Sequence, residues 1–454
     1  MLDTGEPYRL SWCLMADIAT TTSLSYRRIF WFWIPLAAMW FMMAVEQPLI
    51  AAFIARMPDP ELNLAAYGVV YSIALIIESP VIMLLTAGTA LSRGALSYRR
   101  LLRFSHLMMG GLTALHLLIG LTPLFDLIVV RIIGAPEPVA QLGRGAFLVL
   151  TPWSAAVGYR RLWQGVLIRH DRTGVVPATI AVRLAVIAVL LTIGYSLPRY
   201  SGVFVGAAAV AGGVIAAAAA AYLFARPVVR RNLSDTLPEK DALSWRELFA
   251  FYLPLALTSL ILLAARPLLT VAISRLPLAL DSLAVWPVLL SVSFLGQSIA
   301  MSYQEVGIAL LQDRSGFVVL QRFARLLGVV MLLIFSAFAL SPLAQIWFRR
   351  VAGLTAVLTE MTRVPMMFLA VLPAVGSAIS WKRGILVSAK VTPAITRSVI
   401  VNLLVLGTLL IVLSYTLPVH GALIAAMAYA GSVVAEWLYL QFAASKAEKR
   451  LFSD

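Results

Sequence analysis

Charged and amide side chains inside long apolar runs are the residues of this chain that could carry chemistry. Glu46 and Arg266 occupy nearly the same place in the two halves of the sequence, where Gln47 corresponds to Arg266. A guanidinium is permanently charged and offers forked donors to an anion, whereas a carboxyl group can bind and release a proton. We expect Arg266 and Gln47 to contact an anionic solute and Glu46 to take up a coupling proton. The alternative is a structural Glu–Arg pair that holds the two halves together.

Further polar residues lie near the middle of other apolar runs. Glu78 is a second candidate for the coupling proton, and Gln297 and Ser298 stand at the corresponding place in the second half as candidate solute ligands. Glu305 either binds solute near the mouth of the site or extends toward the membrane interface. Ionisable residues at membrane depth are costly and persist mainly beside a cavity or a partner. The remaining intramembrane charges are Arg183 and Glu436, for which pairing within their own half is favoured, and Arg397.

Three pairs of arginines recur at matching positions of the two halves, near the ends of the apolar runs. They would form a positively charged outer vestibule that attracts or releases anions. Anchoring of helix ends to lipid phosphates is an equally good interpretation. The pairs are Arg56 with Arg275, Arg131 with Arg350, and Arg144 with Arg363.

The elements that position these residues are membrane helices. Hydrophobic residues make up 61% of the 454-residue chain and charged residues 13%, which leaves too little polar surface to coat a soluble globule. A bilayer core of about 30 Å needs roughly 20 apolar residues in a helix. Runs of that size predict twelve spans, at residues 29–55, 65–91, 103–123, 143–168, 174–196, 202–225, 247–274, 282–311, 323–347, 356–380, 393–415 and 420–444.

The net charge of +15 comes mainly from Lys and Arg in the amino terminus, in the loops that follow even-numbered spans, and in the carboxyl tail. By the positive-inside rule, both termini are expected in the cytoplasm, and we expect a multi-pass protein of a bacterial inner membrane. These basic residues are spread over several loops and do not form one patch, which argues against nucleic-acid binding.

The halves repeat at a constant shift of 219 residues. At that shift Pro48 falls on Pro267 and Gly134 on Gly353, besides the arginine pairs. Six spans per copy is an even number, so the copies share one orientation and are related by an axis along the membrane normal. Such lobes would rock to expose a central site to each side in turn. We predict an amino-terminal segment (1–28), an N-lobe (29–225), a cytoplasmic linker (226–246), a C-lobe (247–445) and a cytoplasmic tail (446–454).

Enzymatic chemistry is not indicated. The sequence has no Walker A motif and no HExxH motif, and His106 and His116 are not at the i, i+4 spacing of metal ligands on a helix. The single cysteine, Cys13, excludes a disulfide framework. We therefore expect no metal site, no cofactor and no enzymatic activity. The expected partners are a small anionic solute, a coupling proton or sodium ion and membrane lipids, and the expected state is a monomer.

Short motifs suggest a family. They are Glu46-Gln47, the run from Ala66 to Ser72, Gly165 to His170, Arg266-Pro267 and Val419 to Ala422, with Glu436 in the last span. With the six-plus-six arrangement, these motifs resemble the progressive ankylosis (ANK) family. That family lies within the superfamily of multidrug and toxic compound extrusion (MATE) transporters and oligosaccharide flippases (MOP). The resemblance implies a MATE-like all-α membrane fold and export of small multivalent anions such as pyrophosphate, nucleotides and citrate.

The leading interpretation is thus a secondary transporter that exports small anions by rocker-switch alternating access. A proton- or sodium-coupled multidrug or cation antiporter is the first alternative, favoured by Glu46 and Glu78 and opposed by Arg266. A flippase for lipid-linked saccharide is the second, and a membrane scaffold without transport is the third.

Overall fold

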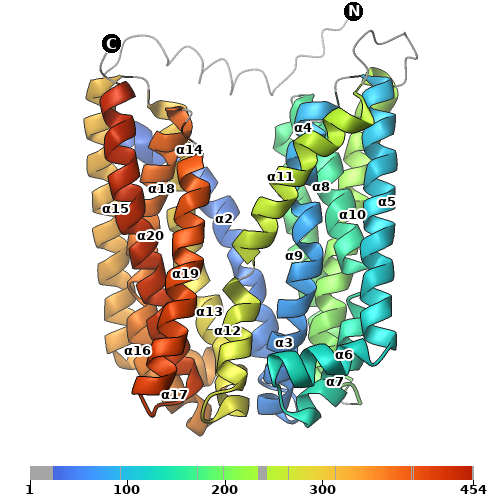
Figure 1. The fold of residues 1–454 in the computed structure, drawn as a ribbon, viewed down its shortest axis with the longest axis vertical. Coiled ribbons are helices and arrows are strands. Elements are labelled where there is room, and N and C mark those ends of the chain that lie inside the picture. The colour runs from blue at the N-terminus through green and yellow to red at the C-terminus, as the bar shows by residue number, and fades with distance from the viewer. Residues whose placement is uncertain are drawn as a thin grey trace, which may run out of the picture.

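The computed structural model describes residues 24–451, apart from residues 93, 171, 198, 234–242, 264, 312, 390 and 392. The described chain is helical nearly throughout (Figure 1). The first half contains α2 (Tyr26–Ile54), α3 (Pro60–Glu78), η1 (Ser79–Met83), α4 (Leu84–Leu91), α5 (Ala95–Leu121), α6 (Leu124–Asp126), η2 (Leu127–Ile133), α7 (Glu137–Val149), α8 (Trp153–Arg169), η3 (Thr173–Val175), α9 (Val176–Tyr195) and α10 (Gly202–Asn232).

The second half repeats this order. It contains α11 (Trp245–Leu263), α12 (Ala265–Ser274), α13 (Ala279–Met301), α14 (Tyr303–Leu310), α15 (Arg314–Leu340), α16 (Pro342–Ile346), η4 (Trp347–Val351), α17 (Ala356–Leu369), α18 (Leu372–Ser388), α19 (Pro393–Thr416) and α20 (Gly421–Leu451). The two halves form two helical bundles that stand side by side in Figure 1, and we keep the names N-lobe and C-lobe for them.

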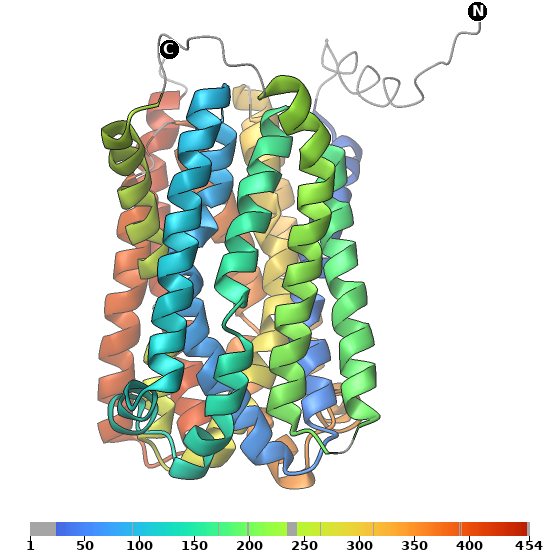
Figure 2. The ribbon, with the colours of Figure 1, turned by 90° about the vertical axis from the view of Figure 1, so that its right-hand side faces the viewer.

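Ten helices within the described residues are long and apolar enough to cross a membrane. The two other predicted spans, 143–168 and 247–274, correspond to α7 with α8 and to α11 with α12. The first is interrupted near its middle at residues 150–152, whereas residue 264, between α11 and α12, lies outside the described residues. In the first of them, Pro152 lacks the N–H that a continuous helix requires, and the chain turns between α7 and α8 (Figure 2). The chain is a multi-pass membrane protein with an all-α fold.

Helix α2 begins, α10 ends, α11 begins and α20 ends at the upper end of the bundles in Figure 1, which we call the termini side. The other end is called the opposite side. The sequence places a linker from residue 226, but α10 continues to Asn232. Much of the predicted linker lies outside the described residues, as do most of the amino-terminal segment and the last residues of the tail.

The backbone itself carries the repeat. Asp59 and Leu278 have φ of 51° and 53°, in the left-handed region that is unusual for residues other than glycine. Gly134 and Gly353 have φ of 83° and 79°. Each pair is separated by the 219-residue shift, and a π-helix, η2 or η4, precedes each of the two glycines. These coincidences confirm two lobes related by a pseudo-two-fold axis.

The axis passes close to Gly68 and Pro287. These two residues are equivalent under the repeat, and they contact each other between α3 and α13. A Cβ atom built on Gly68 would lie 2.8 Å from Cγ of Pro287. At a two-fold axis a residue meets its own equivalent, so this close approach marks where the lobes pack in the middle of the protein. A side chain at position 68 would push the lobes apart.

The first helix of each lobe crosses to the other lobe toward the termini side. The Trp33 indole of α2 donates to the Ser302 hydroxyl of the C-lobe at 2.8 Å. The Tyr252 hydroxyl of α11 donates to the Pro80 carbonyl of the N-lobe. Trp33 and Tyr252 are equivalent under the repeat. The acceptor Pro80 lies in η1, directly after α3, and the acceptor Ser302 lies between α13 and α14. Each crossing helix therefore contacts a break in a helix of the other lobe.

Candidate functional site

A polar cavity of about 290 Å³ lies in the C-lobe, on the side that faces α2. Its lining combines three predicted site residues, Gln297, Glu305 and Glu436, with Arg383 of α18 and Trp40 of α2. The cavity therefore takes residues from both lobes. It brings together two predicted solute ligands, Gln297 and Glu305, with Glu436, for which pairing within its own half was favoured.

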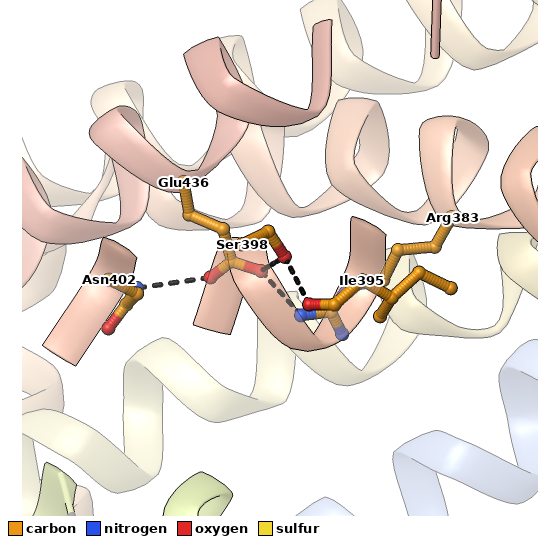
Figure 3. A network of polar contacts seen from close by, with 5 residues as sticks. All are labelled: Arg383, Ile395, Ser398, Asn402 and Glu436. Atoms are coloured by element: carbon orange, nitrogen blue, oxygen red, sulfur yellow. Dashed lines mark hydrogen bonds and ion pairs between the residues drawn. The ribbon is translucent and has the colours of Figure 1, made fainter. Parts of the chain in front are cut away.

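Glu436 is the centre of a buried network in this cavity. The Arg383 guanidinium donates to one carboxylate oxygen. The Ser398 hydroxyl lies 3.3 Å from the same oxygen and 2.7 Å from the Ile395 carbonyl, which is the closer acceptor of its single hydrogen. The Asn402 amide donates to the other oxygen at 3.0 Å. Figure 3 shows Arg383 and Asn402 approaching the carboxylate from opposite sides. Both oxygens of Glu436 are thus satisfied, as a buried carboxylate requires, whereas Nε of Arg383 has no hydrogen-bond partner.

Glu305 has a different environment. The Trp40 indole donates to Glu305 at 3.3 Å, and no described Lys, Arg or His side chain forms an ion pair with it. Gln297 lines the cavity and donates to the Ser293 hydroxyl at 3.1 Å. Ser298 is fully buried and donates to a carbonyl of its own helix. The structure thus gathers Gln297 and Glu305 at the cavity, whereas Ser298 is bonded within its helix.

The N-lobe has its own buried charge centre. The Glu46 carboxylate accepts from the Arg183 guanidinium at 2.5 Å, and their side chains are 6% and 14% exposed. From the sequence, a structural pair of Glu46 with Arg266 of the other lobe was the alternative to a role in transport. The structure instead gives Glu46 a partner in its own lobe, because α2 packs against α9. Pairing within a lobe, which we favoured for Arg183 and Glu436, is what the structure shows for both.

Glu78 lies near the same centre. It is buried, and its Oε2 atom has no hydrogen-bond partner. Arg183, Arg160 and Arg161 are close enough to Glu78 for electrostatic interaction. With all groups ionised, this N-lobe cluster of Glu46, Glu78, Arg160, Arg161 and Arg183 has three positive and two negative charges.

Gln47 lies between the lobes. It accepts from the Tyr67 hydroxyl at 3.2 Å and lines a narrow cavity of about 50 Å³ between α2, α3, α12 and α13. Arg266 belongs to α12, but its side chain lies outside the described part of the structure. The predicted contact of Arg266 and Gln47 with an anion stays a prediction.

The repeat relates the two polar centres. Asn402 and Ser398 of the C-lobe correspond to Arg183 and Thr179 of the N-lobe, and Arg383 corresponds to Gln164. Gln164 donates to Thr179 at 2.8 Å. The same helix positions therefore build a polar centre in each lobe, but the charged residues are distributed differently.

Sequence reasoning missed some of the residues in these centres. Arg383 lies after the predicted end of its span at residue 380, although α18 continues to Ser388. Arg160 and Arg161 lie inside predicted span 143–168 and were passed over. The repeat could have indicated these centres. Gln164 corresponds to Arg383 and Arg183 corresponds to Asn402, so a polar residue is present at the same position of both lobes.

The opposite side is closed by two reciprocal contacts. Arg56 of the N-lobe donates to the carbonyls of Arg350 and Val351 in η4, the second at 2.6 Å. Arg275 of the C-lobe donates to the carbonyl of Ile132 in η2 at 2.5 Å. Arg56 corresponds to Arg275 and Val351 to Ile132, so one contact repeats the other across the axis. We call these contacts the arginine clasp.

The other predicted vestibule arginines also lie on exposed parts of the opposite side. Arg144 pairs with Asp126, and Arg363 with Glu360 at 3.6 Å. Arg131 and Arg350 belong to the π-helices. Arg397, by contrast, is an exposed residue near the start of α19 and does not line the C-lobe cavity. Among the described residues, no cluster of three His, Cys, Asp or Glu side chains could hold a metal ion.

Comparisons with known proteins address the fold. No family model matches the sequence, and no curated protein sequence matches it. Solved structures do match over nearly the full chain. An inward-facing multidrug resistance MATE family transporter of the MOP superfamily has a TM-score of 0.62 at 16% identity, over 96% of this chain and 98% of the other. The chain has a MATE-like fold.

Two further structures show how far this likeness extends. The lipid II flippase MurJ, in an inward closed conformation, has a TM-score of 0.68 at 12% identity, over 91% of this chain and 87% of the other. An outward-facing MATE family transporter has a TM-score of 0.53 at 14% identity, over 93% and 96% of the two chains. At these identities the likeness establishes the fold and not a substrate.

Proposed function

We propose that this protein is a secondary transporter that moves a small charged solute by alternating access. The observation that carries the proposal is the asymmetry between the two ends of the lobe interface. On the opposite side the arginine clasp joins the lobes. Toward the termini side a polar cavity takes residues from both lobes and contains charged groups. A site of this kind, sealed at one end, is what rocking lobes require.

The state of the protein is inward-facing under this proposal. The positive-inside rule puts the termini side in the cytoplasm, so the clasp would close the periplasmic side. The higher TM-score with an inward-facing MATE transporter, 0.62, than with an outward-facing one, 0.53, supports this assignment.

For the solute, we propose a small anion, in line with the resemblance to the ANK family. Two features support it. Arg383 lines the C-lobe cavity and places a permanent positive charge there. The N-lobe cluster has an excess of one positive charge when all its groups are ionised.

A second candidate, cation antiport, is favoured by Glu305. This half-buried carboxylate lines the same cavity, has no ion pair within the described residues, and lies beside the Trp40 indole. A carboxylate with an aromatic face is the arrangement that binds organic cations. The two candidates therefore depend on different residues of one cavity.

Flux measurements in proteoliposomes test both candidates. Citrate, pyrophosphate and a nucleotide represent anions, and a quaternary ammonium dye represents cations. For an anion exporter we expect Arg383→Ala to abolish flux, Arg383→Lys to retain part of it, and Glu305→Gln to reduce it little. The matched control Arg397→Ala removes an exposed arginine and should leave flux unchanged. Flux of the dye that depends on Glu305 would select cation antiport, and no flux of any solute would reject transport.

The coupling ion is proposed to be a proton carried in the N-lobe. Glu78 is the better of the two predicted carriers, because Glu46 is held by Arg183 whereas Glu78 has an oxygen without a partner. Sodium is the alternative, and replacement of sodium by choline in the flux assay separates the two ions.

A further inference from the structure

A groove of about 610 Å³ lies between the lobes toward the opposite side. Its walls come from α2 and α9 of the N-lobe and from α13 and η4 of the C-lobe. Several of its apolar lining residues are exposed, including Phe41 (41%), Tyr195 (51%) and Val351 (45%). A contiguous exposed apolar surface on a membrane protein is one that lipid can cover, and the groove shares no lining residue with the polar C-lobe cavity.

The groove has the length of a lipid chain. Its lining along α2 extends from Phe41 to Arg56. At 1.5 Å per helical residue this distance is about 22 Å. One leaflet of the hydrocarbon core is about 15 Å thick, so this length is enough to cross one leaflet and reach the headgroups. The groove therefore runs from near the middle of the bilayer to the headgroup region.

Its chemistry changes along this length. The inner part is formed by residues such as Val45, Leu49 and Leu295, whereas Arg56 lines the outer end. Arg349 and Arg350 are exposed in η4, next to the lining residue Val351. The lining contains no acidic residue. An apolar channel that ends at arginines is complementary to one molecule with an apolar chain and an anionic head.

We propose that this groove binds an acyl chain of an anionic phospholipid, with the lipid phosphate at Arg349 and Arg350. The lipid contacts both lobes at once, and it does so only while the clasp holds η4 against the end of α2. A ligand that binds one state better than another shifts the population toward that state. Bound phospholipid therefore favours the conformation that is closed on the opposite side. This inference does not depend on which solute the protein transports.

Native mass spectrometry of the full chain tests the site. The delipidated protein is titrated with phosphatidylglycerol and with phosphatidylcholine of the same acyl chains. We expect one phosphatidylglycerol to be retained more strongly than phosphatidylcholine. Removing Arg349 and Arg350 together, as alanines, should reduce the preference by roughly fivefold for each arginine. The carbonyl of residue 350 remains for Arg56, so this change leaves the clasp in place.

Matched variants separate the groove from the rest of the surface. Arg131→Ala removes the repeat equivalent of Arg350 from the other lobe and should leave the preference unchanged. Val45→Trp should fill the groove and release the retained lipid, whereas Val189→Trp changes an exposed residue of α9 outside the lining. If Val45→Trp fails to fold, the arginine variants decide alone. Equal retention of the two lipids by the unaltered protein, or an unchanged preference in the arginine variant, would overturn the proposal.

Discussion

Arg56 and Arg275 make the same contact in opposite directions across the lobe interface. Arg56 donates to the Val351 carbonyl of η4, and Arg275 donates to the Ile132 carbonyl of η2. The acceptors are carbonyls in the last turns of the two π-helices, where the end of a helix leaves carbonyls without an intrahelical partner. Each contact of the clasp therefore joins an arginine of one lobe to the end of a π-helix in the other lobe. Because of the repeat, this contact is present once in each direction.

Removing the clasp should open the opposite side. Each contact is exposed, so we assign it a stabilising free energy of about 0.5–1 kcal/mol. The double variant Arg56→Ala, Arg275→Ala loses both contacts and should therefore shift the ratio of closed to open protein by roughly 5- to 30-fold. Spin labels at Leu127 and Ile346, two exposed and repeat-related positions, report the lobe distance in a Cys13→Ser background. Pulsed electron resonance should show a longer population in the double variant. Arg131→Ala serves as control. An unchanged distance distribution would mean that the clasp does not hold the lobes.

The glycines beside the clasp are a second test. Gly353 has φ of 79°, and a Cβ atom there would lie 3.0 Å from Cγ of Arg56. Gly353→Ala should therefore destabilise the protein by about 1 kcal/mol or more, because the new methyl group strains the backbone and displaces Arg56. Gly145→Ala, in α7 with no neighbour within 4 Å, should be neutral or slightly stabilising. Thermal unfolding in detergent compares the two, and equal melting temperatures would contradict the prediction.

The sequence predicted the fold well because its signals are local or periodic. Apolar run length identifies membrane helices, and the 219-residue shift requires the two-fold arrangement. The shift even predicts backbone conformation, since Asp59 and Leu278 share a left-handed φ without sharing a residue type. The interruption between α7 and α8 was harder to predict, because a long apolar run does not reveal where a helix breaks.

The partners of the buried charges could not be predicted. The neighbour that Glu46 contacts depends on how α2 is rotated about its axis and on where α2 crosses toward the C-lobe. The rotation and the crossing both arise from packing between segments that are distant in the sequence. Arg183 is separated from Glu46 by 137 positions. Position within a span predicted that these charges are buried, but it could not select Arg183 over Arg266 as the partner.

A double-mutant cycle should show that Arg383 and Glu436 act as a pair. Breaking a buried pair by removing one partner typically costs about 3–5 kcal/mol, and the partial exposure of Arg383, 22%, reduces that cost. Glu436→Gln and Arg383→Gln should each lower the unfolding temperature, whereas the double variant should recover part of the loss. Additive losses would indicate that each residue is stabilised by other contacts. Flux through the double variant should still be absent if Arg383 binds the solute.

Proton coupling should depend on Glu78. Glutamine preserves the shape of the side chain but cannot release a proton, so Glu78→Gln should abolish the response of flux to an imposed pH gradient. Exchange of labelled for unlabelled solute needs no net proton movement and should persist in the same vesicles. This split distinguishes loss of coupling from loss of folding or binding. The control Glu360→Gln changes an exposed carboxylate on the opposite side, 67% exposed, and should keep the full response. If Glu78→Gln vesicles respond to the pH gradient as the unaltered protein does, the coupling proton is carried elsewhere, and Glu46→Gln becomes the variant to measure.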